Sequence, residues 1–213
     1  MVYSFAMNSR KSGGKPYTHF IGVPVGDDLA SLTEDCRRWM GERYGCKSGY
    51  RTEPHVTLIA PFALGADDAV EYDVEPADAF GRTDSRSPRD NLARILHEAI
   101  GALDSFSAHV QGFGTFGDRT IYARVVCDPR WDAWRSAVWK AVQAGFPGML
   151  PPLRGAFVPH LTVANRDIPA GAVAPALEYF ASLGLDETFT VGEASLFEFA
   201  NGRWETVERF CAC

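Results

Sequence analysis

One pattern occurs twice in the sequence and restricts the fold more than any other feature: proline, histidine, an apolar residue, threonine and a second apolar residue. The copies are Pro54–Leu58 and Pro159–Val163, about 105 residues apart. Shuffling the same composition gives two His-apolar-Thr-apolar tetrapeptides in roughly one or two sequences per thousand, so chance is a poor explanation. In a β-strand, residues i and i+2 share a face, about 6.6 Å apart along the chain. Each copy therefore predicts a strand with His and Thr on one face and two packed apolar residues on the other.

The segments around the two copies follow the same order of predicted elements: strand, helix, strand and helix. Apolar residues at helical spacing predict helices over 27–40, 91–103, 131–144 and 172–183. Apolar runs bounded by turn residues predict strands at 17–25, 54–62, 106–113, 120–127, 157–164, 189–199 and 204–210, the last two joined at Asn201-Gly202. This repeated order predicts an α+β fold made by duplication of one lobe, although the two halves share no clear sequence identity.

The composition indicates a single globular domain. Of 213 residues, 46% are hydrophobic and 12% aromatic, which is enough for a core. No apolar run approaches the roughly 18 residues of a membrane-spanning helix, so we expect no membrane association. The net charge of −6 argues against a broad basic surface for long nucleic acids and favours small substrates. Five cysteines at scattered spacings favour reduced thiols in the cytoplasm over a disulfide framework.

Two segments lie outside the repeated pattern. We expect residues 1–16 to form a flexible tail, since they combine serine, glycine and basic residues and lack the apolar segment of a secretory signal. Residues 17–213 then form one domain. Within it, residues 63–90 are an acidic insertion that also contains proline and glycine. Two interpretations of this insertion stay open, a solvated surface loop and a flap over a site.

The repeated pattern also predicts a reaction, the cleavage of a phosphodiester without a metal. If duplication makes the two strands face each other, the polar side chains of both copies converge: His55, Thr57, His160 and Thr162. One histidine can then take a proton from an attacking water while the other, protonated, gives a proton to a departing ribose oxygen, because the pKa of histidine lies near 6.5. The threonine hydroxyls can donate hydrogen bonds to the non-bridging phosphate oxygens. We expect no metal and no cofactor at such a site, and the sequence leaves open which histidine is the acid.

The segments PHVTLIAPF and VPHLTVANR resemble the paired His-x-Thr-x motifs of the two-histidine phosphoesterase superfamily, the 2′-5′ RNA ligase-like and cyclic phosphodiesterase family. The order of elements agrees over nearly the whole chain. The resemblance implies a bilobal fold, with two pseudo-symmetric lobes whose antiparallel sheets face a central groove. It also implies hydrolysis of 2′,3′-cyclic phosphates or 2′-5′ linkages in nucleotides or RNA ends. His55 and His160 would be catalytic, and Thr57 and Thr162 would bind the phosphate. The acidic insertion matches no feature of the family and leaves the size of the substrate open.

The sequence leaves the roles of three further residues and the class of protein open. Arg166 is either a phosphate ligand or a solvated loop residue. Tyr17 and Phe62 can stack on a nucleobase, although burial preference favours the core for Phe62. The alternative to an enzyme is a non-catalytic nucleotide- or phosphate-binding domain, which would not require two proton-transfer groups. A two-histidine metal hydrolase lacks an evident carboxylate ligand near either motif. We expect a nucleotide or short RNA as the substrate and no protein partner; the position of the product phosphate, 2′ or 3′, is open.

Overall fold

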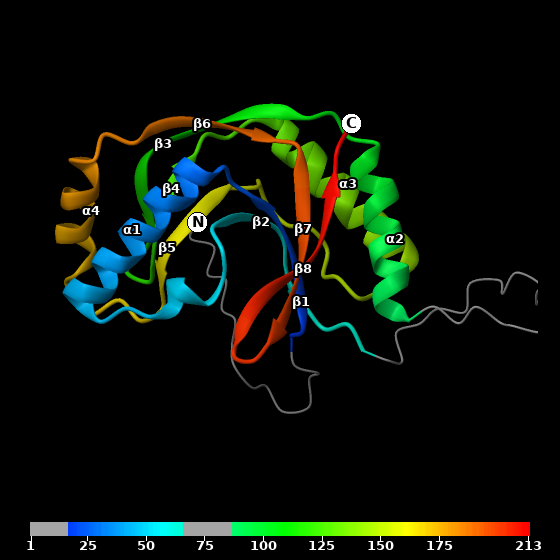
Figure 1. The fold of residues 1–213 in the computed structure, drawn as a ribbon, viewed down its shortest axis with the longest axis horizontal. Helices are drawn as coiled ribbons and strands as arrows, with labels where there is room; N and C mark the ends of the chain where they lie inside the picture. The colour runs from blue at the N-terminus through cyan, green and yellow to red at the C-terminus, as the bar shows by residue number, and fades with distance from the viewer. Residues whose placement is uncertain (1–16, 66–86) are drawn as a thin grey trace, which may run out of the picture.

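The computed structural model describes residues 17–65 and 87–213 (Figure 1). In these ranges the strands are β1 (His19–Pro24), β2 (His55–Phe62), β3 (Phe106–Phe116), β4 (Thr120–Val125), β5 (His160–Asn165), β6 (Asp186–Val191), β7 (Glu193–Ala200) and β8 (Arg203–Cys211). The helices are α1 (Asp27–Tyr44), the short 3-10 helix η1 (Ser48–Arg51), α2 (Pro88–Gly101), α3 (Pro129–Gly145) and α4 (Val173–Ala181). None of the helices in this described part has the length and apolar character that a membrane span requires. The predicted tail, 1–16, and residues 66–86 of the predicted insertion lie outside the described residues.

The eight strands form one antiparallel sheet in the order β6-β3-β4-β5-β2-β1-β7-β8. The two motif strands, β2 and β5, are neighbours at its centre, where Val56 pairs with Leu161. Longer ladders extend outward from them, since β2 also pairs with β1 and β5 with β4. The sheet therefore consists of two four-stranded halves joined along a short central seam.

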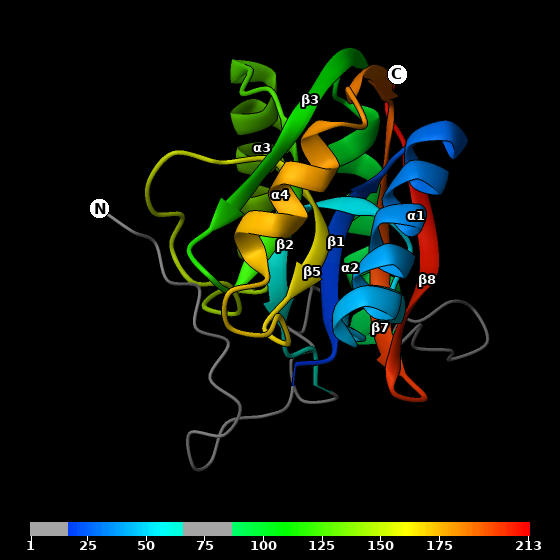
Figure 2. The same ribbon diagram turned by 90° about the vertical axis from the view of Figure 1, so that its left-hand side faces the viewer.

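The two halves are related by the order and packing of their elements. The unit β1-α1-β2 corresponds to β4-α3-β5, and each helix packs across the seam, because α1 contacts β5 and α3 contacts β2. The remaining helices pack on strands of the half that they follow in the chain, with α4 on β3 and α2 on β7 and β8. Figures 1 and 2 show α1 and α4 gathered at one end of the sheet and α2 and α3 at the other. The α+β class and the antiparallel strands are confirmed, and the arrangement is consistent with two pseudo-symmetric lobes.

The motif strands have one packed and one open face, as the period-two pattern predicts. Val56, Leu58, Leu161 and Val163 are each at most 2% exposed. Val163 packs in a cluster with residues of α1 and α4, and the other three belong to the larger core that α2 and α3 help to form. The histidine and threonine of each motif are only half-buried. The helices therefore cover the apolar face and leave the opposite face of the central strands to the polar residues.

One predicted strand, 189–199, is wrong, because the segment forms two strands. It divides at Gly192 into β6 and β7, which lie in opposite halves of the sheet: β6 pairs with β3, while β7 pairs with β1 and β8. Apolar residues continue on both sides of Gly192, so the hydrophobic pattern does not predict that the chain passes there from one half of the sheet to the other. The end of the predicted insertion also differs, since α2 begins at Pro88. A capping box explains this start: the Ser87 hydroxyl accepts from the Asp90 amide, and the Asp90 carboxylate accepts from the Ser87 amide.

Candidate active site

The two copies of the motif bring four polar side chains to the open face at the centre of the sheet. His55 begins β2 and His160 begins β5, and both rings are half-buried. The strands are antiparallel and pair through the apolar residue that follows each histidine. This register places His55 beside Thr162 and Thr57 beside His160. The structure thus brings together all four residues that the sequence singled out.

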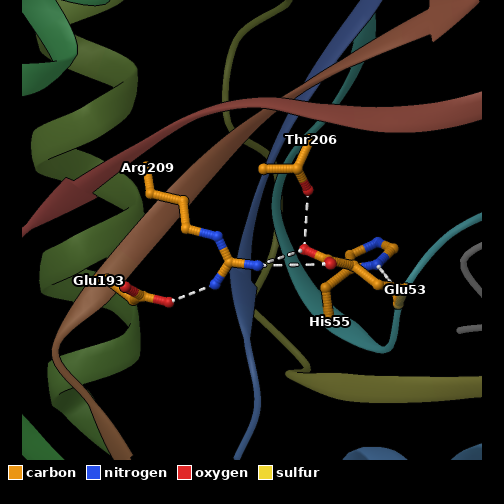
Figure 3. Close-up of polar contacts among 5 residues, drawn as sticks. All are labelled: Glu53, His55, Glu193, Thr206 and Arg209. Atoms are coloured by element: carbon orange, nitrogen blue, oxygen red, sulfur yellow. Dashed lines mark hydrogen bonds and ion pairs between the residues drawn. The ribbon is translucent and has the colours of Figure 1, made fainter.

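A backbone carbonyl two residues before each histidine determines its tautomer. His55 Nδ1 lies 2.8 Å from the Glu53 carbonyl oxygen (Figure 3), and His160 Nδ1 lies 2.8 Å from that of Val158. Because a carbonyl oxygen only accepts hydrogen bonds, Nδ1 must donate in both rings. In the neutral rings the proton is therefore on Nδ1, and Nε2 carries the lone pair. Each imidazole can therefore accept a proton at Nε2 and, once protonated, donate it from the same atom.

The two threonines are held in different ways. Thr57 Oγ1 lies 3.1 Å from His55 Nε2 and donates to it, since Nε2 of the neutral ring is an acceptor. Thr162 is fixed through its main chain, because its carbonyl oxygen accepts from Arg37 Nε at 3.2 Å and from Arg37 Nη2 at 3.0 Å. Both hydroxyls remain on the face that carries the imidazoles.

Two aromatic rings flank each histidine. Their centroids lie between 4.7 and 5.3 Å from the centroid of the imidazole. The pairs are Phe20 of β1 with Phe197 of β7 at His55, and Tyr122 of β4 with Phe116 of β3 at His160. Since β1 corresponds to β4 and β7 to β3 in the two halves, the relation between the halves extends to the walls of the site. These rings pack against both imidazoles and cover part of each.

Burial makes both histidines harder to protonate than a free imidazole. The pKa of His55 is lowered to about 4: burial is the main cause, the charges of Arg37 and His160 add to it, and the Glu53 carbonyl opposes it. Burial likewise lowers the pKa of His160, against the opposing effect of the Val158 carbonyl. At neutral pH the folded chain therefore holds His55 as a neutral base. A bound phosphate would favour the charged form of either ring by adding negative charge.

Arg37 on α1 places a positive charge beneath the motif strands. It is 4% exposed, and besides Thr162 it donates through Nη1 to the Thr52 carbonyl at 2.8 Å. Burial lowers the pKa of its guanidinium to about 10, so it stays charged at neutral pH. Sequence reasoning missed this residue. The available signal was an arginine between Cys36 and Met40, on the apolar stripe of the predicted helix.

Arg124 on β4 is a second cation that the sequence did not reveal. It lies directly opposite His160 in the β4–β5 ladder, and cross-strand neighbours have Cβ atoms about 4.5–5.5 Å apart. Its side chain is exposed, and Nη2 donates to the Phe113 carbonyl at 2.9 Å. The position opposite His55 is occupied by Pro24, so only the His160 side has this charge. Finding it required the register between two strands distant in sequence.

The weaker predicted residues lie apart from the four central side chains. Arg166 is exposed on the turn after β5, with φ 74°, and its amide donates to the Arg119 carbonyl. Tyr17 is 49% exposed just before β1. Phe62 is 3% exposed and stacks on His19 within the core, which leaves no ring face for a nucleobase. The packing interpretation of Phe62 is therefore the one that the structure supports.

A metal centre has no evident ligand set in the described part of the chain. Across residues 17–65 and 87–213, no group of three His, Cys, Asp or Glu side chains is placed to hold a metal ion. All five cysteines lie in these ranges, and none of them is in a disulfide.

Comparisons with known proteins give the family of the chain and agree with its fold. The model of the 2′-5′ RNA ligase superfamily matches residues 25–203. Protein TT0787 of Thermus thermophilus has a similar structure, with TM-score 0.59, 16% identity and coverage of 91% of this chain and 97% of that one. LigT of E. coli, in its complex with 3′-AMP, gives TM-score 0.57, 16% identity and coverage of 93% and 99%. No curated protein matches the sequence. The chain belongs to the 2′-5′ RNA ligase superfamily, within the two-histidine phosphoesterases.

Proposed function

We propose that the protein is a metal-independent phosphodiesterase that hydrolyses 2′,3′-cyclic phosphate or 2′-5′ phosphodiester bonds of nucleotides or RNA ends. The observation that carries this proposal is the pair of imidazoles on adjacent central strands, each with Nδ1 bound to a carbonyl, so that Nε2 carries the lone pair that can accept a proton. Family membership supports the reaction class, and the 3′-AMP bound to the similar LigT supports a nucleotide as the substrate.

The proposed reaction uses one histidine as base and the other as acid. The neutral ring accepts a proton from water at Nε2 as the water oxygen forms a bond to phosphorus. The bond from phosphorus to the ribose oxygen breaks, and the protonated ring donates its Nε2 proton to that oxygen. The product is a phosphate monoester with a free ribose hydroxyl. The symmetric arrangement of His55 and His160 allows either assignment, and the assignment decides which ribose oxygen leaves.

Charge on the phosphate is balanced in this proposal by donors around the two rings. When phosphate binds, Thr57 donates to a non-bridging oxygen in place of His55 Nε2, and Thr162 donates to another, where negative charge is held during the reaction. Arg37 supplies a buried positive charge below the seam, and Arg124 can reach an anion beside His160. The local positive charge at the site is compatible with the overall charge of −6.

The proposal is tested by turnover of 2′,3′-cyclic AMP and a 2′-5′-linked diadenylate in excess chelator. Wild type, His55→Ala and His160→Ala are compared, with His97→Ala as a matched control because His97 is exposed on α2. We expect hydrolysis by wild type and the control, and a loss of about 100-fold or more in each motif variant. Circular dichroism verifies that each variant is folded.

Three outcomes would contradict parts of this assignment. Activity that disappears in chelator would indicate a metal hydrolase. Nucleotide binding without turnover, unchanged by either substitution, would indicate the non-catalytic binding domain. Loss of activity in only one motif variant would show that the reaction does not use two proton-transfer groups.

A further inference from the structure

A chain of polar contacts holds the residue that orients His55. The Glu53 carboxylate accepts from Thr206 Oγ1 at 2.8 Å and from Arg209 Nη2 at 3.3 and 3.4 Å (Figure 3). Arg209 Nη1 donates in turn to Glu193 at 2.8 Å. Glu53 precedes β2, whereas Thr206 and Arg209 lie on β8 and Glu193 begins β7. The last strand of the chain is thereby fastened to the start of a central strand.

Glu53 uses two different groups for these contacts. Its carboxylate is bound by β8, and its main-chain carbonyl accepts from His55 Nδ1. Movement of residue 53 would therefore remove the acceptor that keeps the His55 proton on Nδ1. With Phe20 and Phe197 against the ring, this hydrogen bond is the polar contact that sets its orientation at that edge.

The corresponding position at the other histidine has no such anchor. Val158 supplies the carbonyl for His160 Nδ1, but its side chain is apolar and Val158 is 44% exposed. The two halves of the site thus have the same histidine tautomer and the same kind of aromatic walls. They differ in whether the residue that supplies the acceptor carbonyl is itself held by side-chain contacts. This difference makes His55 the more rigidly oriented of the two rings.

The contacts around Glu53 are too exposed to contribute much to stability. The side chains of Arg209 and Glu53 are 48% and 36% exposed, and that of Glu193 is 35% exposed. Ion pairs at such exposure stabilise a fold very little. Their removal should leave a folded protein, so an effect on the site can be measured separately from an effect on the fold.

We propose that Glu53, held by Thr206 and Arg209, is a positioning residue that keeps His55 in the Nδ1–H form with Nε2 directed at the substrate. This inference rests on the proposed phosphodiesterase function. Glu53 acts through the imidazole and does not touch the reacting atoms.

The kinetic test uses Glu53→Ala and Arg209→Ala with 2′,3′-cyclic AMP as substrate. We expect kcat to fall roughly 10- to 100-fold with KM within about twofold of wild type, because the base loses its orientation while phosphate binding is unchanged. Glu53→Gln should restore most of kcat, since its amide oxygen can still accept from Thr206 and Arg209. The matched control is Arg203→Ala, which removes an exposed ion pair to Glu205 on the same strand.

A spectroscopic test does not depend on activity. In ¹⁵N-histidine NMR at pH 7, with the His55 signal assigned by its loss in His55→Ala, we expect the Nδ1–H tautomer in wild type. Glu53→Ala should mix the tautomers of His55 and leave His160 unchanged. If the wild type hydrolyses neither substrate but the tautomer changes as expected, the phosphodiesterase proposal fails while the positioning of His55 by Glu53 stands. Unchanged kcat and tautomer in Glu53→Ala, or a raised KM alone, would overturn the positioning role.

Discussion

At the scale of single residues, the surroundings of His55 connect the chemistry of the site to the stability of the fold. The pKa of His55 is about 4 in the folded chain, chiefly through burial, and about 6.5 in an unfolded chain. Above pH 6.5 the ring is neutral in both states, so its titration does not change the free energy of unfolding. As pH falls from 6.5 to 4, the unfolded state takes up the proton first and the free energy of unfolding decreases, by at most about 3 kcal/mol.

A His55→Gln variant should therefore lose less stability than wild type between pH 7 and pH 4. The measurement is urea denaturation at a series of pH values, and the quantity compared is the pH slope, since the substitution also changes stability at pH 7. A His55→Gln slope equal to that of wild type would contradict a lowered pKa in the folded state.

The close approach of Gly22 to the imidazole gives a second prediction at this scale. A Cβ added at Gly22 would lie 2.9 Å from His55 Cδ2 and 3.3 Å from Phe20, so the ring must shift. Gly22→Ala should reduce turnover at least about tenfold, with a stability loss of about 1–3 kcal/mol. Gly26→Ala is the matched control, since its Cβ would meet no atom within 4 Å. Wild-type turnover in Gly22→Ala would show that the position of the ring is not critical.

At the scale of elements, α1 supports the opposite half of the site through Arg37. The three hydrogen bonds of Arg37 go to the carbonyls of Thr52 and Thr162, and Arg37→Met would remove all three. We expect a loss of about 2–4 kcal/mol in the free energy of unfolding. Arg38→Met, on the exposed side of the same helix, should change it by less than about 1 kcal/mol.

The same substitution should also change the titration of His55. Next to burial, the charge of Arg37 lowers the pKa of His55, so Arg37→Met should move that pKa upward in an NMR titration. Arg37→Lys keeps the charge without the two-nitrogen contact to Thr162, and it should retain the lowered pKa while losing stability. Equal pKa values in all three proteins would show that Arg37 acts on the fold alone.

The sequence predicts the structure of some elements better than that of others. The motif strands and the four helices follow from periodicity, because one face of each element packs and the other does not. The convergence of the two motifs followed from the repeated order of elements. The division at Gly192 was not predictable, because both sides of it are apolar strands. Arg124, opposite His160, was also missed, since a cross-strand neighbour depends on pairing that periodicity does not specify.

At the scale of the whole molecule, α1 and α3 pack across the seam and join two halves that the sheet alone connects weakly. The seam between β2 and β5 has a single registered pair, Val56 with Leu161. Across it, α1 follows a strand of one half and packs on β5 of the other, while α3 does the reverse on β2. Each half therefore depends on a helix of the other half to cover its central strand.

This arrangement predicts that the two halves unfold together, although their strands form separate ladders. The tryptophans allow a direct measurement: Trp39 reports on α1, and Trp131 and Trp134 report on α3. In 5-fluorotryptophan-labelled protein, the ¹⁹F signals of these residues should disappear at the same urea concentration.

The variant Met40→Ala, which leaves a cavity in the buried cluster beneath α1, should lower the free energy of unfolding by about 2–5 kcal/mol. It should lower the midpoints of Trp131 and Trp134 as much as that of Trp39, because α3 cannot stay packed on β2 once the half containing β5 is lost. A lower midpoint for Trp39 alone would mean that each half is stable by itself, and the site at the seam would then depend on the docking of two independent units.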